Sequence, residues 1–346
     1  MEFLQTEWGW TVILDLFLGG MGAAALVVSA IVRLCTRDRL RKTAACGAWI
    51  ASGCLAVGVI CLLADVGQPL RAMLMPVSFS HPTSWMTFGA WFMFFGVVFA
   101  VLFALSETRR VTTRLGGAHG SAADASKQSA APGAAYDAAA AAHVAGPSWL
   151  APLQVAFAIG GIAFGAAITV YTGFLLSSAS GIPFWDTALL PCTFVALSFL
   201  AGCTAVHLAL EAQERGNEAA TPCTLALRVA VLVFAAASAV TLWLFLNQGM
   251  ITGETAADAA AAVTGGAWAP LFWGGVAVVG VALPAVGALA QLITRKRCWK
   301  IATAMLLCAV IGGLIWRAIV IGLGAHAALY SPAVPQMFQG VTFLFG

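Results

Sequence analysis

Long apolar runs separated by short polar connections dominate this chain. A bilayer core needs roughly 20 apolar residues per helix, and eight segments of the sequence are long and apolar enough to cross one. They cover about 8–34, 43–66, 85–106, 148–176, 187–210, 223–247, 268–293 and 299–325. The pattern therefore predicts an all-α membrane protein with eight transmembrane helices, which we expect to form two four-helix bundles.

The connections divide the chain unevenly. We expect three helices within residues 1–106 and five within 148–325. Residues 107–147 between them are rich in Ala, Gly and Ser without apolar periodicity, which indicates a cytoplasmic linker or a weak helix. Residues 326–346 form an outer C-terminal tail that is apolar and carries no Asp, Glu, Lys or Arg. Such a surface is typical of contact with a partner protein.

Charged residues are few and lie mostly on one side of the predicted bundle. They make up 9% of the chain, whereas a soluble domain has about a quarter. Fifteen of the 17 Lys and Arg residues fall in or beside the loops that follow odd-numbered helices. Under the positive-inside rule, those loops face the cytoplasm and both termini face outward from the cell membrane. The net charge of +3, without a clustered basic face, argues against nucleic acid as a partner.

Ionisable and hydroxyl side chains recur at one depth in the outer half of the predicted bundle. From the helical rise, Asp15 lies about 10 Å, Tyr171 about 8 Å and Arg317 about 12 Å below the outer ends of their helices. Asp65 closes the second helix, and Arg71 follows it in the outer loop. An ionisable residue inside a membrane span marks a functional site by default. The layer therefore predicts a site for an amphipathic ligand that enters from lipid.

A quinone fits this layer, because its tail stays in hydrocarbon while its head exchanges protons with acid–base groups. Burial disfavours a charged carboxylate, so we expect Asp15 to exchange a proton with the quinone near neutral pH. Other interpretations stay open for single residues. Asp15 and Arg317 can form a structural ion pair. Asp65 can cap its helix and pair with Arg71, and Tyr171 can belong to an interfacial aromatic belt.

The sequence shows no ligand set for a redox centre or metal of its own. A haem held by two histidines needs both within helices, and only His207 lies well inside one. The nine cysteines contain no C-x-x-C spacing, so we expect no iron–sulfur cluster. Gln154, Thr169 and His207 are the only hints of an inward proton path, and His207 can equally be an inner-interface residue.

Four segments resemble the NrfD/PsrC family, the integral membrane subunits related to polysulfide reductase. The first helix begins WGWTVILDLFLGGMGAAA at residue 8 and is similar to the first helix of that family. Residues 62–91 (LLADVGQPLRAMLMPVSFSHPTSWMTFGAW) and 170–202 (VYTGFLLSSASGIPFWDTALLPCTFVALSFLAG) resemble its two long signatures. Residues 312–324 (GGLIWRAIVIGLG) match its late arginine. The four matches follow one another in the order that the family shows.

The resemblance implies a quinone site near the outer face and a partner docked there. That partner is an iron–sulfur subunit of the ferredoxin-like, four-cluster type, which connects the membrane subunit to a molybdopterin catalytic subunit. By position, Asp15 stands where a characterised relative has a histidine near the quinone, and Tyr171 matches a tyrosine that contacts the quinone. The relative has an asparagine one turn earlier on that helix, where this chain has Val12.

We therefore expect a quinone-binding membrane subunit that exchanges electrons between the quinone pool (menaquinone or another quinone) and the iron–sulfur partner. Asp15 would exchange protons with the quinone, and the residues expected to line the site are Tyr171, Trp10, Arg317 and Trp185. Asp65, Arg71 and Asp186 would support the site or the local structure. The alternatives are an anchor without a quinone site, which predicts a buried Asp15–Arg317 pair, or a secondary transporter, which predicts midplane polar groups and interrupted helices.

Overall fold

Every regular element in the described part of the chain is a helix, and eight of the helices are long and apolar enough to span a membrane. The computed structural model describes residues 9–36, 39–65, 85–125, 150–179 and 181–324. The spans are α1 (Trp10–Thr36), α2 (Arg41–Asp65), α4 (Trp85–Ala125), α6 (Leu150–Ser177), α7 (Leu189–Gln213), α8 (Thr221–Thr252), the π-helix η2 (Leu271–Ala282) continued by α10 (Leu283–Thr294), and α11 (Trp299–Gly322). Two short elements, η1 (Glu218–Ala220) and α9 (Glu254–Thr264), flank α8. The prediction of an all-α protein with eight spans is confirmed.

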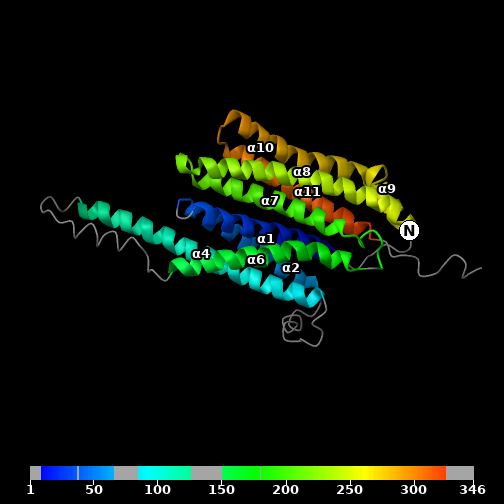
Figure 1. Ribbon diagram of the computed structural model, residues 1–346, viewed down its shortest axis with the longest axis horizontal. Helices are drawn as coiled ribbons and strands as arrows, with labels where there is room; N and C mark the ends of the chain where they lie inside the picture. Colours follow the sequence, from blue (N-terminus) through cyan, green and yellow to red (C-terminus); the bar gives the residue numbers. More distant parts are fainter. Residues whose placement is uncertain (1–8, 37–38, 66–84, 126–149, 180, 325–346) are drawn as a thin grey trace, which may run out of the picture.

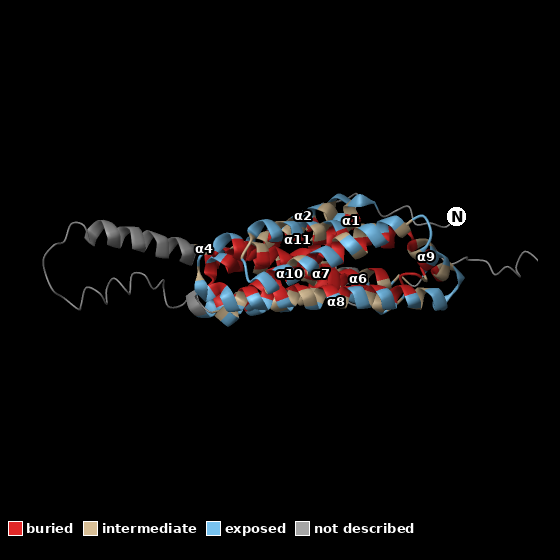
Figure 2. Cartoon of the chain, turned by 90° about the horizontal axis from the view of Figure 1, so that it is seen from above, coloured by how far each residue is buried: buried red, intermediate tan, exposed pale blue. Residues whose placement is uncertain are grey.

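The helices form two neighbouring groups (Figure 1). The helices α1, α2, α4 and α6 pack together, and α7, α8, α10 and α11 form the second group with η2 and α9. Contacts of α1 with α7 and α11 join the two groups. In α1 and α7, about four-fifths of the most apolar 18-residue stretch is buried (83% and 78%), whereas in the other spans half of that stretch or less is buried. The buried residues therefore concentrate along the middle of the molecule, which Figure 2 shows in red.

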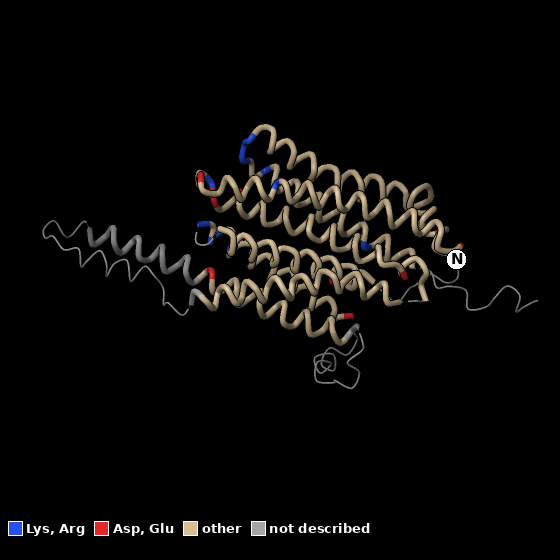
Figure 3. The backbone as a smooth tube through the Cα atoms, viewed as in Figure 1, with Lys and Arg blue, Asp and Glu red and all other residues tan. Residues whose placement is uncertain are grey.

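Basic side chains gather at one end of the bundle (Figure 3). This basic end is where α1 ends and α2 begins, and Arg317 is the one described Lys or Arg that lies far from it. The opposite end, where α2 finishes at Asp65, is called the Asp65 end below. The uneven distribution of charge in the sequence is thus also present in three dimensions. Which end faces the cytoplasm stays a prediction.

The expected linker starts as a continuation of a helix. The helix α4 runs on to Ala125, through the first half of the stretch at 107–147 that we expected to be a linker or a weak helix. The rest of that stretch and the tail at 326–346 lie outside the described residues. The predicted division of the chain into 1–106, 107–147, 148–325 and 326–346 therefore stays a prediction.

Candidate functional site

The carboxyl group of Asp15 is buried and partly unpaired. Asp15 is 8% exposed, and its Oδ1 atom is buried without a hydrogen-bond partner. This oxygen faces Gly58 of α2, where a Cβ would lie 3.2 Å from it. The absence of a side chain at Gly58 therefore makes room for the carboxyl group between α1 and α2. A buried polar atom without a partner is uncommon and typically marks a strained or functional site.

Tyr171 brings a phenol from α6 to the same region. Its half-buried ring lies over Gly89 of α4, where an added Cβ would overlap the ring. Phe92, one turn further along α4, contacts the ring edge-on with 6.5 Å between centroids. Asp15 lies within electrostatic range of the phenol. The structure thus brings together Asp15 and Tyr171, which are far apart in the sequence.

A hydroxyl and a second carboxyl group lie at the exposed edge of this site. The Thr11 hydroxyl, one turn before Asp15 on α1, donates to Oδ1 of Asp65 at 2.6 Å. Asp65 is exposed and within electrostatic range of Asp15. Thr11 was not predicted from the sequence, although its i, i+4 spacing from Asp15 places it on the same helix face. The expected pairing of Asp65 with Arg71 is not tested, because Arg71 lies outside the described residues.

Arg317 is fully buried on another side of α1. Its Nε donates to the Leu16 carbonyl oxygen at 3.1 Å, and its Nη1 donates to the carbonyl oxygen of Gly313 at 3.1 Å. Its Nη2 donates to the Ser198 hydroxyl of α7 at 2.8 Å. The guanidinium group therefore links α1, α7 and α11 where the two helix groups meet.

Two aromatic rings complete the environment of this guanidinium group. Its carbon lies 5.2 Å from the ring centroid of Phe17 and 4.7 Å from that of Phe194, within the range of cation–π attraction.

Between Asp15 and Arg317, both of which the structure describes, there is no ion pair. The structural pair that the sequence left open is therefore not formed.

The other residues expected near the quinone are spread over the Asp65 end. Trp10 starts α1 and is 72% exposed. Trp185 lies between α6 and α7, is 1% exposed, and donates from its indole nitrogen to the Val320 carbonyl oxygen of α11 at 2.8 Å. Asp186, the next residue, is exposed. Trp185 thus belongs to the packing of the second helix group.

The three residues proposed for an inward proton path do not form a connected series. Gln154 donates to the Ser106 carbonyl oxygen at 2.9 Å, near the basic end. Thr169, on the same helix, donates to the Gly165 carbonyl oxygen at 2.8 Å. Gln154 and Thr169 are about 22 Å apart along α6, and His207 lies on α7. Among the described residues, no hydrogen bond joins any two of these three.

His207 belongs to a buried polar network at the basic end. Its Nε2 shares a 2.7 Å hydrogen bond with Oε1 of Gln291. Glu211, one turn later, accepts from Nη2 of Arg228 at 3.0 Å and pairs with Arg297 at 3.5 Å. This network ties α7 to α8 and to the segment around α10. Of this network, only His207 was singled out from the sequence; charged or amide residues within apolar segments are the signal that could have indicated the other members.

A second buried ion pair lies at the same end of the first helix group. Nε of Arg33 contacts Oε1 of Glu107 at 2.8 Å, and the Glu107 side chain is fully buried. This pair joins α1 to α4. The signal that could have revealed it was an acidic residue at the end of an apolar run, next to the basic loop segments.

Two comparisons with known proteins identify the family to which this chain belongs. The family described as polysulphide reductase, NrfD, matches residues 2–326 of this protein. The protein is also similar to the C subunit of polysulfide reductase from Wolinella succinogenes, with 29% identity over 301 residues, which cover 82% of this sequence and 84% of that subunit. The resemblance inferred from the four segments is therefore confirmed, and the chain belongs to the NrfD polysulphide reductase family of multi-pass membrane proteins.

Proposed function

We propose that this membrane subunit works in a polysulfide reductase-type complex and binds a quinone beside Asp15. In this role it exchanges electrons between the membrane quinone pool and an iron–sulfur subunit. The observation that carries the proposal is the buried, unpartnered Oδ1 of Asp15, within a transmembrane helix and in electrostatic range of Tyr171. Family membership supports the same conclusion.

The residues present fit the head of a quinone. Oδ1 of Asp15 can accept a hydrogen bond from a hydroxyl group, and the Tyr171 phenol can donate one to a carbonyl oxygen. A bound quinol supplies electrons and protons together. Phe92 and Met93 of α4 place apolar side chains on the same side of the site, where they limit the access of water.

The protein residues hold and move the proton. Asp15 takes it up at Oδ1, the carboxylate oxygen that has no hydrogen-bond partner within the protein. Asp65 is exposed and in electrostatic range of Asp15, so it offers a route to solvent at the same end. We propose Trp10 as a further lining residue. Arg317 and Trp185 are positioning residues that hold α1 and α11 through their backbone contacts.

The proposed orientation places the Asp65 end outside the cell membrane, as the positive-inside rule predicts. An iron–sulfur subunit of the ferredoxin-like, four-cluster type docks on this outer face and passes electrons to or from a molybdopterin catalytic subunit. Arg71, Asp186 and the apolar tail at 326–346 belong to this face by their place in the sequence. We propose menaquinone as the quinone.

The geometry favours this function over the two alternatives. A structural anchor predicts a buried Asp15–Arg317 pair, whereas the three hydrogen bonds of Arg317 go to other groups. A secondary transporter predicts ionisable groups near the midplane. Asp15 and Arg317 instead lie in the half of the bundle nearer the Asp65 end.

The test is a binding titration with the purified full-length subunit in detergent. A fluorescent hydroxyquinoline oxide, which mimics a quinol head, is titrated against the wild type and Asp15→Asn at several pH values. We expect saturable binding to one site, and we expect Asp15→Asn to weaken it at least tenfold or to remove its pH dependence. Asp258→Asn, which changes an exposed carboxylate on α9 at the same end, should bind as the wild type does.

The result of this titration distinguishes a quinone site at Asp15 from a quinone site elsewhere and from an anchor without a quinone site. Equal binding by the wild type and Asp15→Asn would place the quinone elsewhere and leave Asp15 a structural residue. Without saturable binding, the titration is repeated on the assembled complex. Failure there as well would favour the anchor function.

A further inference from the structure

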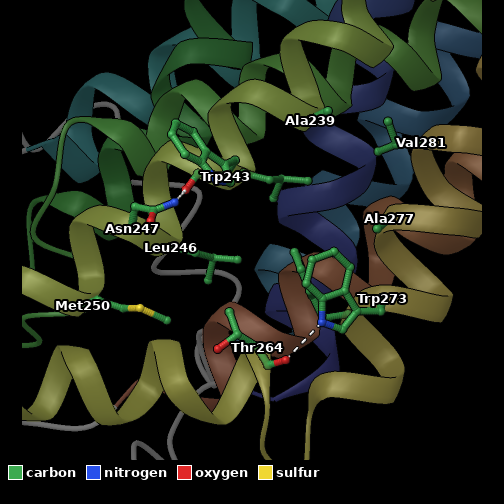
Figure 4. A pocket seen from close by; sticks show the side chains of 11 residues that line it. Ala239, Trp243, Leu246, Asn247, Met250, Thr264, Trp273, Ala277 and Val281 are labelled. Atoms are coloured by element: carbon green, nitrogen blue, oxygen red, sulfur yellow. Dashed lines mark hydrogen bonds between the residues drawn. The ribbon is translucent and has the colours of Figure 1, made fainter.

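A cavity of about 450 Å³ lies in the second helix group, away from Asp15. It opens between α8, η2 and the end of α9 (Figure 4). The residues that line it are Ala239, Leu242, Trp243, Leu246, Asn247, Met250, Thr264, Phe272, Trp273, Ala277 and Val281. The volume falls in the range of about 300–1,000 Å³ that is typical of sites for small molecules.

Aromatic rings border this cavity on two helices. Figure 4 shows Trp243 of α8 and Trp273 of η2 on opposite sides of the space. The Trp273 indole nitrogen donates to the Thr264 carbonyl oxygen at 3.0 Å, which fixes that ring. Both tryptophans are more than half exposed on the bundle surface, at 64% and 55%. In a membrane the cavity therefore opens sideways toward lipid rather than toward water.

The chemistry of the lining selects the kind of ligand. None of the eleven lining side chains is ionisable, so the head of a quinone would find no acid–base partner here. The polar groups are Asn247, whose amide nitrogen donates to the Trp243 carbonyl oxygen at 2.7 Å, and Thr264. Asn247 lies five residues before α8 ends at Thr252, at the Asp65 end of the bundle. Thr264 is the last residue of α9, the short helix that follows α8 at the same end.

The length of the cavity matches one leaflet of a bilayer. Ala239 and Met250 are 11 positions apart on α8, which corresponds to about 16 Å. Half of a hydrocarbon core is about 15 Å thick. The cavity therefore extends from near the membrane surface to near the midplane, as a single acyl chain does.

The facing wall is a π-helix of 12 residues. The π-helical turn is rare and is found frequently at functional sites. Here the π-helical segment supplies Phe272, Trp273, Ala277 and Val281 to the cavity. The widened turn thus shapes the wall against which a ligand would pack.

We infer that this cavity holds one acyl chain of a phospholipid from the leaflet at the Asp65 end. The acyl chain lies between Trp243 and Trp273, and the glycerol region of the lipid reaches Asn247. The lipid fills the space between α8 and η2 and so stabilises the second helix group. The inference is independent of the quinone site at Asp15.

Native mass spectrometry of the purified full-length protein tests this inference, with dioleoyl phosphatidylglycerol as the probe. We expect the wild type to retain one lipid at detergent concentrations that remove all others. Ala277→Phe and Ala239→Phe fill the cavity from its two walls and should each weaken retention at least tenfold. The neighbouring Val278→Phe and Val240→Phe change exposed residues outside the lining and should retain the lipid.

A second measurement covers variants that fold poorly. Added lipid should raise the melting temperature of the wild type and of both control variants more than that of either filled variant. Equal retention by filled and control variants would overturn the inference. So would displacement of the single lipid by an equimolar short-chain menaquinone, because the cavity would then be an isoprenoid site. Loss of binding at Asp15 in the separate titration would leave these results unchanged.

Discussion

Tyr171 of α6 occupies the space that a side chain at Gly89 of α4 would need. Two transmembrane helices therefore approach each other closely only because residue 89 is a glycine. The contact fixes the phenol within electrostatic range of Asp15, which itself lies against another glycine, Gly58. The two groups proposed to meet the quinone head thus depend on small residues of the facing helices.

Gly89→Ala should displace the Tyr171 ring and weaken binding of the hydroxyquinoline oxide about tenfold or more. Insertion of a methyl group into a packed interior costs about 1–3 kcal/mol. Gly53→Ala is the control, because a Cβ at Gly53 has nothing within 4 Å, and this variant should bind normally. Fluorescence titration and thermal unfolding of both variants check this. If Gly89→Ala binds as tightly as the wild type, Tyr171 does not contact the ligand.

Arg317→Lys should destabilise the protein, although it keeps the charge. A lysine cannot reproduce the forked geometry that reaches the Leu16 carbonyl, the Gly313 carbonyl and the Ser198 hydroxyl. We expect a loss of about 2 kcal/mol, since hydrogen bonds to a charged group contribute about 1.5–3 kcal/mol each. Unfolding in mixed detergent measures the loss. Arg215→Lys, at an exposed position beside Trp299, should change stability little.

Glu211→Gln should also destabilise the protein, because it leaves Arg228 and Arg297 without their carboxylate partner. Removal of one partner from a buried ion pair costs about 3–5 kcal/mol, and the partial exposure of Arg297 puts this case at the lower end. Glu218→Gln, at an exposed position nearby, is the control in the same unfolding assay. A loss no larger than that of the control would mean that the network contributes no stability.

His207→Gln should leave quinol oxidation by the assembled complex within about twofold of the wild type. About 22 Å of α6 separate Gln154 from Thr169, and His207 hydrogen-bonds instead to Gln291. Proton exchange at Asp15 should therefore use the Asp65 end alone. Turnover and external acidification of complex-containing vesicles measure this. A loss of acidification in His207→Gln would restore the inward path.

Single cysteines at the two ends of the bundle should report its orientation. Glu254 and Glu218 are both exposed, at the Asp65 end and the basic end respectively. In a cysteine-free background, a membrane-impermeant maleimide should label Glu254→Cys in intact cells and Glu218→Cys only after lysis. The reverse pattern would invert the proposed topology.

Local sequence information was sufficient for the helices, the uneven charge and the family. Eight apolar segments are each long enough to cross a bilayer, and this property depends on composition within one segment. The order of the four family segments is likewise a property of the sequence alone. Asp15 and Tyr171 were recognised because a polar group in an apolar run stands out from its neighbours.

The partners of those residues were decided only by the tertiary structure. A helix that is apolar on all sides carries little information on which face meets which neighbour. For this reason the sequence could not show that Arg317 binds the Leu16 carbonyl rather than Asp15, or that Trp185 binds the carbonyl of Val320. The rotation of each helix about its own axis, set by close packing of side chains, determined these contacts and the cavity between α8 and η2.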